Sequence, residues 1–282
     1  KQGMATTDNN LFLRFWAELD FNKIGFGFKD RISAKDSEIK WFPYNKGGDF
    51  RKWYGNNEYV VDYKNDGEDL INLVKLKYPK ITDPEFVIKN RDYYFKKGIT
   101  WSLFGWKNFG VRYKDYGFIF DVSGSSAFPE EDKVYYILAY LASKVSFKFL
   151  STIAPTVNFQ IGNIGDLPLI YINDKVDIID KYVDENIQIS KCDWDSFEVS
   201  WDYKKHPLLV FKCGHRMYEA FAKWDEFTNN QYEKVKYNEE ELNKIFINIY
   251  QLKDELTPDV DDKDITIRKA DREREIKSFI SY

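Results

Sequence analysis

The chain has 282 residues, 43% of them hydrophobic and 31% charged, and its net charge at pH 7 is −4. This length and composition predict a soluble globular protein of one large or two ordinary domains. Because no apolar run approaches the ~20 residues of a membrane span and no signal-peptide pattern opens the chain, we expect no membrane partner and a cytoplasmic location. Two cysteines, Cys192 and Cys213, are too few for a disulfide framework.

Charge is divided unevenly along the chain. Residues 1–120 contain 21 Lys and Arg against 16 Asp and Glu, a net charge of +5. Residues 121–282 contain 21 basic and 30 acidic residues, a net charge of −9. This asymmetry predicts a phosphate-facing N-terminal part and a solvated or protein-facing C-terminal part.

The first half of the chain is rich in aromatic residues, glycine and short extended runs. β-Branched and aromatic residues between Gly, Asn and Asp breakers predict strands at residues 58–63, 98–104, 109–113 and 117–122. Residues 114–117 are expected to form a hairpin turn between the last two strands. One helix is predicted at residues 67–77, where Leu70, Leu73 and Val74 recur at helical spacing.

From residue 130 the pattern becomes helical. An acidic first turn after Pro129 and an apolar stripe predict a helix at residues 130–150, whereas residues 158–169 are expected to form a strand, a turn and a returning strand. Further helices are predicted at residues 175–186, 215–223, 239–250 and 270–280. The last one lacks a capping residue at its end, so we expect it to be truncated.

These elements predict an α+β fold. A mixed or antiparallel sheet is expected in residues 1–170, and a mainly helical region is expected in residues 171–282.

Two short motifs resemble parts of an amino-methyltransferase site. Such a site needs a Gly-rich cofactor loop and an Asp/Asn-Pro-Pro-aromatic turn beside the flipped base. Gly25 and Gly27 form a lone Gly-x-Gly before a poor helix, and in the run from Asp83 to Phe86 a glutamate, Glu85, replaces the second proline. We therefore predict neither catalytic nor cofactor-binding residues in this chain.

Patterns for metal-dependent chemistry are also present but weak. Two Glu-x-Lys runs, which begin at Glu38 and Glu275, each follow an upstream acid as in metal-dependent nucleases. In a chain with 46 acidic and 42 basic residues such matches are expected by chance, and a solvated face is the favoured interpretation. The spacing of Cys213 and His215 matches no common zinc module, so no metal site is predicted.

Basic and aromatic residues alternate in two segments of the first half, residues 40–59 and 93–116. Lys and Arg neutralise phosphates, Asn and Arg pair with base edges, and the intervening glycines permit close approach to a duplex. Double-stranded DNA is therefore the predicted partner, and the alternative for each aromatic residue is burial in the core. The residues predicted to contact DNA in these segments are Asn45, Lys46, Arg51, Lys52, Trp53, Tyr54, Asn56, Trp101, Lys107, Arg112 and Tyr113.

Three further candidates for DNA contact lie outside those segments. Ser125, in a Ser-Gly-Ser-Ser run, is placed to help bind a phosphate through backbone amides, or else belongs to an ordinary turn. Asn158 and Gln160 would share one face of the predicted strand and point at a groove, or else cap the adjoining turn.

An aromatic face is predicted just before residue 202. Trp194, Phe197 and Trp201 fall at helical spacing, with Asp193 as the expected N-cap. We interpret this face as a packing surface that docks the C-terminal helices.

Residues 186–209, together with residues 40–59 and 239–265, resemble the PglX-type adenine-specific DNA methyltransferases of bacteriophage exclusion and related single-chain restriction-modification enzymes. The resemblance is to the part of those enzymes that follows the methyltransferase domain. In that family the methyltransferase domain binds S-adenosylmethionine and methylates adenine N6, and a following target-recognition domain selects the DNA sequence.

The resemblance implies that residues 1–170 form a DNA target-recognition region and residues 171–282 a helical region next to it. The fragment itself would be non-catalytic and would bind no cofactor, and its parent would use S-adenosylmethionine. Expected partners are double-stranded DNA, the parent's own methyltransferase domain and other defence-system proteins. The alternative is an interaction scaffold that docks a methyltransferase domain or defence proteins without reading DNA.

Overall fold

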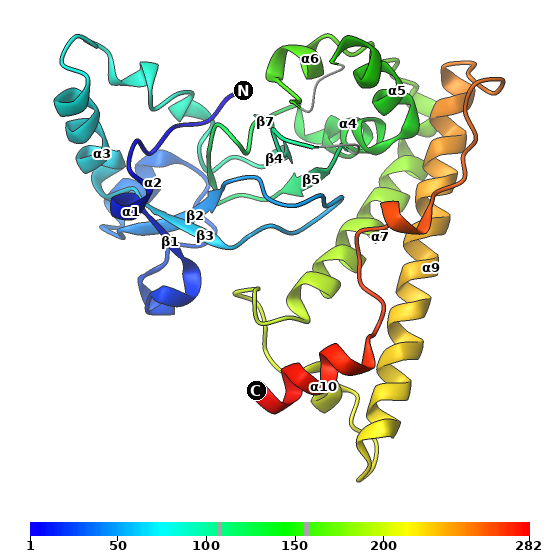
Figure 1. Cartoon of the computed structure of the whole chain (residues 1–282). Helices are drawn as coiled ribbons and strands as arrows, with labels where there is room; N and C mark the ends of the chain where they lie inside the picture. Colours follow the sequence, from blue (N-terminus) through cyan, green and yellow to red (C-terminus); the bar gives the residue numbers. More distant parts are fainter. Residues whose placement is uncertain (106–108, 155–157) are drawn as a thin grey trace. The chain divides into compact units, whose positions relative to one another are not determined.

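A computed structural model describes residues 1–105, 109–154 and 158–282. The chain divides into two compact units (Figure 1). Unit 1 comprises Lys1–Arg51, Asn56–Ala142 and Ser146–Leu169, and unit 2 comprises Lys52–Gly55, Ser143–Val145 and Ile170–Tyr282. Helices and two sheets are both present, which confirms the predicted α+β class.

Unit 1 contains both sheets. The first has the strand order β1-β3-β2-β6, in which only β6 runs parallel to its neighbour, and the second is antiparallel with the order β5-β4-β7. The strands are β1 (Leu13–Phe15), β2 (Trp41–Asn45), β3 (Tyr59–Asp62), β4 (Gly98–Trp101), β5 (Val111–Lys114), β6 (Ile119–Phe120) and β7 (Ser126–Ala127). The helices are α1 (Asn9–Phe12), α2 (Arg31–Asp36), α3 (Lys64–Lys77), α4 (Val134–Ala142), α5 (Lys144–Ile153), whose first two residues belong to unit 2, and α6 (Ile161–Gly165).

The core of unit 1 is built from aromatic rings on the strands. Phe42, Phe95 and Phe120 are fully buried, and the rings of Phe42 and Phe95 meet edge to face with their centroids 5.4 Å apart. Burial of each such ring stabilises the fold by about 2 kcal/mol. Part of the aromatic content of the first half of the sequence therefore lies in this core.

The predicted hairpin at residues 114–117 is wrong. β5 pairs with β4 in one sheet, whereas β6 pairs in parallel with β2 in the other, so the turn carries the chain between sheets. Gly117 makes this possible because its φ is +97° and a Cβ there would lie 2.8 Å from the amide nitrogen of Gly27. The predicted helix at residues 67–77 is confirmed within α3, whose regular part follows three residues with left-handed backbone.

The single helix predicted at residues 130–150 is instead two, α4 and α5, separated at Ser143. The side chain of Asn243 accepts a hydrogen bond (2.9 Å) from the amide of Lys144 and so satisfies the start of α5. The strand pair predicted at residues 158–169 is also wrong. Gln160 and Asn163 form a reciprocal capping box that begins α6 at Ile161.

Unit 2 is helical, as predicted for the second half. It contains α7 (Val176–Asp195), α8 (Pro207–Val210), α9 (Met217–Ile249) and α10 (Arg272–Ser281). α7 and α9 lie side by side (Figure 1), and between them the amide of Asn238 donates to that of Asn186 (3.0 Å). The helices predicted at residues 215–223 and 239–250 are two ends of the single helix α9.

The aromatic face around Trp194 is formed differently from the expectation. Asp193 lies inside α7 and is not an N-cap, because the helix continues to Asp195. Trp194 and Trp201 are nonetheless buried, and the guanidinium of Arg268 stacks 4.1 Å from the ring centroid of Phe197. These contacts agree with a packing role. Within the described residues no helix is both long and apolar enough to cross a membrane.

Candidate nucleic-acid interface

The end of β2 carries a network centred on Asp121. The Tyr44 hydroxyl donates to this carboxylate (2.7 Å), and the Lys46 ammonium lies 3.5 Å from it. Burial, reinforced by the charge of Asp121, raises the pKa of Tyr44 well above its usual value. Lys46 keeps 26% of its side chain exposed and also donates to Oδ1 of Asn9 (3.4 Å). Lys46 is therefore the accessible cation at this end of the strand.

Asn45 and Ser125 are buried beside this network. The Asn45 amide donates to the carbonyl of Gly124 (2.9 Å) and to the Thr100 hydroxyl, and so joins the two sheets. The Ser125 hydroxyl donates to the carbonyl of Val122 (3.1 Å). The amides of Ser123, Gly124 and Ser126 in the same turn already donate to oxygens of Asp121 or Lys1, so three of its four amides are occupied internally.

Arg112 and Arg51 are buried inside unit 1. The Arg112 guanidinium approaches the Arg51 carbonyl and the Ser102 hydroxyl, each at 3.4 Å, and the Ser102 hydroxyl donates to the carbonyl of Gly48 (2.8 Å). Burial, and then the charge of Arg51, lowers the pKa of Arg112 to about 10. These contacts hold the loop that follows β2, and they involve an arginine that the sequence predicts to contact DNA.

Lys52, Trp53 and Tyr54 belong to unit 2. The Lys52 ammonium and the Trp53 indole N–H (2.7 Å) both donate to the carboxylate of Glu239 on α9. The side chains of Lys52, Trp53 and Glu239 are each at least 90% buried. Tyr54 is half-buried, with the Lys191 ammonium 5.2 Å from its ring centroid.

The remaining predicted residues are scattered. Asn56 is buried and donates to the carbonyl of Asp49 (2.9 Å), and the buried Trp101 donates through its indole N–H to the carbonyl of Phe159 (2.9 Å). Tyr113 and Asn158 are partly exposed, and Gln160 is exposed at the start of α6. Lys107 lies outside the described residues.

An accessible polar surface includes residues of α1, of β1 and of the two ends of β2. The Lys46 ammonium contacts Asn9, and the guanidinium of Arg14 donates to the carbonyl of Asn10 (2.7 Å). Arg14 and Lys40 then flank the half-buried ring of Trp41, 5.7 and 5.4 Å from its centroid. We call this surface the α1 strip, and it consists of Asn9, Asn10, Arg14, Lys40, Trp41 and Lys46.

The cations form the outer layer of the α1 strip. Lys40 pairs with Asp62 at 3.1 Å, but 51% of the lysine side chain is exposed against 7% of the aspartate. In the ion pair of Lys46 with Asp121 the lysine is again the more exposed partner, with 26% of its side chain exposed against 8% of the aspartate.

The sequence patterns did not single out Asn9, Asn10 or Arg14. The sequence feature that predicts them is the pair of asparagines followed by LFLRFW, a basic and aromatic run like residues 40–59 and 93–116.

The residues of the methyltransferase-like motifs pack against the core or cap turns. Gly25 packs against the core, since a Cβ there would lie 2.7 Å from the ring of Phe42, and Asp83 caps a short turn by accepting from the amide of Glu85 (2.9 Å). Glu275, from one nuclease-like pattern, is buried and accepts from the indole N–H of Trp224 (3.0 Å).

The fold of this chain resembles that of a DNA-modifying enzyme. The Type IIL restriction-modification enzyme MmeI, solved in complex with DNA, superposes with a TM-score of 0.56 over 91% of this chain and 33% of that chain. Sequence identity is 12%, so the likeness concerns the fold alone. No protein-family model matches the chain.

Sequence comparison finds two relatives over most or all of the chain. The chain is similar to a C-terminal region of adenine-specific methyltransferases. It is 39% identical over its full length to the adenine-specific methyltransferase PglX of Lacticaseibacillus casei (strain Zhang). It is 36% identical over 91% of its length to the adenine-specific methyltransferase BrxX of Escherichia coli O9:H4 (strain HS).

These matches confirm the PglX-type resemblance found in residues 186–209. The chain spans only 23% of the length of PglX and 20% of that of BrxX.

Proposed function

We propose that the chain is a non-catalytic region that recognises duplex DNA for an adenine-specific methyltransferase of a restriction-modification or phage-exclusion system. The observation that carries this proposal is the match of the whole chain to PglX at 39% identity. The parent enzyme would supply the methyltransferase domain and bind S-adenosylmethionine there. Double-stranded DNA is then the partner of unit 1, and the parent's methyltransferase domain is a second partner.

We place the DNA contacts on the α1 strip. Arg14, Lys40 and Lys46 would neutralise phosphates, and the exposed amide of Asn10 suits the paired donor and acceptor of an adenine edge. The oxygen of Asn9 already accepts from Lys46 and Thr6, so Asn9 would offer its N–H donors alone. Five of the residues predicted from sequence are at least partly exposed and stay candidates for direct contact: Lys46, Tyr54, Tyr113, Asn158 and Gln160. Buried members such as Asn45, Arg51, Asn56, Trp101, Arg112 and Ser125 would contribute by fixing the loops that surround the site.

Substitution of the three strip cations tests this placement. The variant Arg14→Ala/Lys40→Ala/Lys46→Ala is expected to bind duplex DNA more weakly, because each lost phosphate contact lowers the slope of log K against log salt by about 0.9. The matched control is Lys75→Ala/Lys80→Ala/Lys148→Ala, which removes the same charge from exposed lysines of unit 1 away from the strip. Fluorescence anisotropy with a labelled duplex at several salt concentrations measures both.

The control decides between local contact and overall charge. If both triple variants lose the same affinity and slope, the α1 strip is not the interface. If the unsubstituted chain binds no duplex at any salt concentration, the alternative of an interaction scaffold is favoured.

A further inference from the structure

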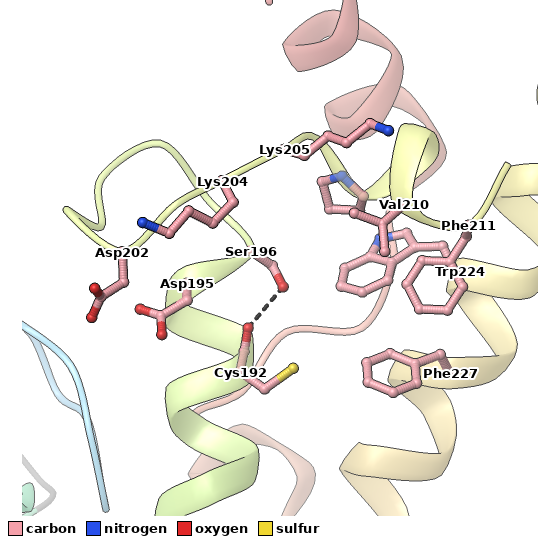
Figure 2. Close-up of a pocket in the computed structure, with 11 residues that line it drawn as sticks. Cys192, Asp195, Ser196, Asp202, Lys204, Lys205, Val210, Phe211, Trp224 and Phe227 are labelled. Carbon is pink, nitrogen blue, oxygen red and sulfur yellow. Dashed lines mark hydrogen bonds between the residues drawn. The ribbon is translucent and has the colours of Figure 1, made fainter.

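Unit 2 contains an apolar pocket that the DNA-binding proposal does not use. Its cavity, about 430 Å³, lies among the end of α7, the loop before α8, α8 itself and the first turns of α9 (Figure 2). We call it the α8–α9 pocket and define it by Lys204, Lys205, Val210, Phe211, Trp224 and Phe227.

Three rings form the apolar part of this pocket. The ring centroids of Phe211 and Trp224 are 5.4 Å apart, and those of Trp224 and Phe227 are 5.7 Å apart. The only polar atom of the Trp224 ring, its indole N–H, already donates to the buried Glu275 (3.0 Å). Val210 adds an aliphatic side chain that is 59% exposed to solvent. This surface suits a large apolar side chain and offers few partners to the polar edge of a base.

The rim of the pocket carries two aspartates and two lysines. Asp195 and Asp202 line one side, but both carboxylates accept hydrogen bonds from the Lys191 ammonium, at 2.6 and 2.9 Å. Lys204 and Lys205 are exposed, and neither makes an ion pair within residues 1–105, 109–154 and 158–282. Two cations are therefore available to a ligand at the mouth of the pocket.

The charge of the surrounding unit favours a protein over a nucleic acid. The residues of unit 2 include 20 Lys and Arg and 25 Asp and Glu, a net charge of −5. A duplex would extend far beyond the pocket over this acidic surface, so repulsion would accumulate along its phosphates. A short acidic segment meets the two lysines at contact distance, and only the screened remainder of the unit's charge opposes it.

The geometry points to a docking site for a protein segment in which one large apolar side chain is flanked by acidic residues. The apolar side chain fills the space beside Phe211, Trp224 and Phe227, and its acidic neighbours pair with Lys204 and Lys205. This inference does not depend on DNA binding by unit 1.

A peptide array tests the chemistry of the occupant. The probes are heptapeptides Gly-Asp-Glu-X-Glu-Asp-Gly, in which X is each of the twenty amino acids, and a second set with Lys in place of Asp and Glu. The full chain is expected to bind the acidic peptides with X = Phe, Trp, Leu or Met about tenfold more tightly than the peptide with X = Ala. The basic set is expected not to bind. Equal binding for X = Phe and X = Ala, or no binding by any acidic peptide, overturns the proposal.

Substitutions at the rim locate the peptide. Lys204→Glu/Lys205→Glu and, separately, Val210→Glu are expected to weaken binding of the X = Phe peptide about tenfold. Lys212→Glu/Lys223→Glu is the matched control, since these exposed lysines do not line the pocket. Equal losses in the pocket and control variants would overturn the site. Duplex binding by the chain is measured on the same variants and is expected to be unchanged, so failure of either proposal can be recognised separately.

The two cysteines provide an internal reporter. Cys192 lines the pocket, and its thiol faces the space opposite Phe227 (Figure 2), whereas Cys213 is exposed and does not line it. Saturating X = Phe peptide is expected to slow the reaction of Cys192 with N-ethylmaleimide and leave Cys213 unaffected. Unchanged reactivity of Cys192 in the presence of bound peptide would contradict occupation of this pocket.

Discussion

Replacing Glu239 by alanine is expected to destabilise the helical unit by about 3 to 5 kcal/mol. The Glu239 carboxylate accepts hydrogen bonds from the Lys52 ammonium and from the indole N–H of Trp53, and both donors are buried. Without the carboxylate, a buried positive charge and a buried N–H lose their acceptor together. Urea unfolding followed by circular dichroism measures the loss.

Two further variants identify the cause of that loss. Glu233→Ala is the matched control, since its ion pair with Lys269 is exposed and 3.6 Å long, and it is expected to cost less than about 1 kcal/mol. The double variant Lys52→Met/Glu239→Gln removes both charges and keeps an acceptor for Trp53, so it is expected to recover most of the stability. A loss below about 1 kcal/mol for Glu239→Ala, or a double variant no better than the single one, would contradict the role of the buried pair.

Replacing Lys114 by methionine is expected to stabilise the protein by about 4 kcal/mol at pH 6. Lys114 lies on β5 with its ammonium buried, 4.7 and 5.2 Å from the ring centroids of Phe120 and Phe128. Within the described residues this ammonium has no hydrogen-bond partner. Burial lowers its pKa from 10.5 to about 7, because the folded protein disfavours the charged form.

The advantage of methionine at this position depends on pH. Below pH 7 both states of the wild-type protein bind the proton, and the penalty for burying the charge is complete. Between pH 7 and 10.5 only the unfolded state binds it, so wild-type stability rises by about 1.4 kcal/mol per pH unit from this group.

Urea unfolding of wild type and Lys114→Met at pH 6, 7.5 and 9 measures this dependence. The gap is expected to shrink as pH rises. The exposed Lys96→Met is the control and should show a small difference that does not vary with pH. A constant gap for Lys114→Met across this range would show that burial does not shift the titration of Lys114.

Helices whose apolar residues recur at helical spacing could be predicted from the sequence, because that spacing is a local property of the chain. The helix at α3 follows from the spacing of Leu70 and Val74, both of which the fold buries. The full length of α9 was missed because its middle turns bury Thr228 and Tyr232, side chains that do not count as a strongly apolar stripe. The break at Ser143 depends on Asn243, a residue a hundred positions away, and no local pattern contains that information.

The candidate site was harder to predict than the fold. Lys52 and Trp53 have the composition of a DNA contact, but composition does not reveal that Glu239 lies opposite them. The burial of Arg112 could not be predicted for the same reason, because its partners are the Arg51 carbonyl, 61 residues away, and the Ser102 hydroxyl. Lys46 was found because it is flanked by the loop glycines, whereas Asn10 was missed because α1 is only four residues long.

Selection of DNA by the unsubstituted chain tests the central proposal most directly. The 282-residue chain is incubated with a pool of duplexes that carry a randomised central segment, and bound duplexes are sequenced after several rounds. The proposal predicts enrichment of a defined sequence, and binding of that sequence over a scrambled duplex that weakens linearly in log salt. Binding of neither duplex at low salt, or enrichment of no sequence, would contradict recognition of DNA by this chain.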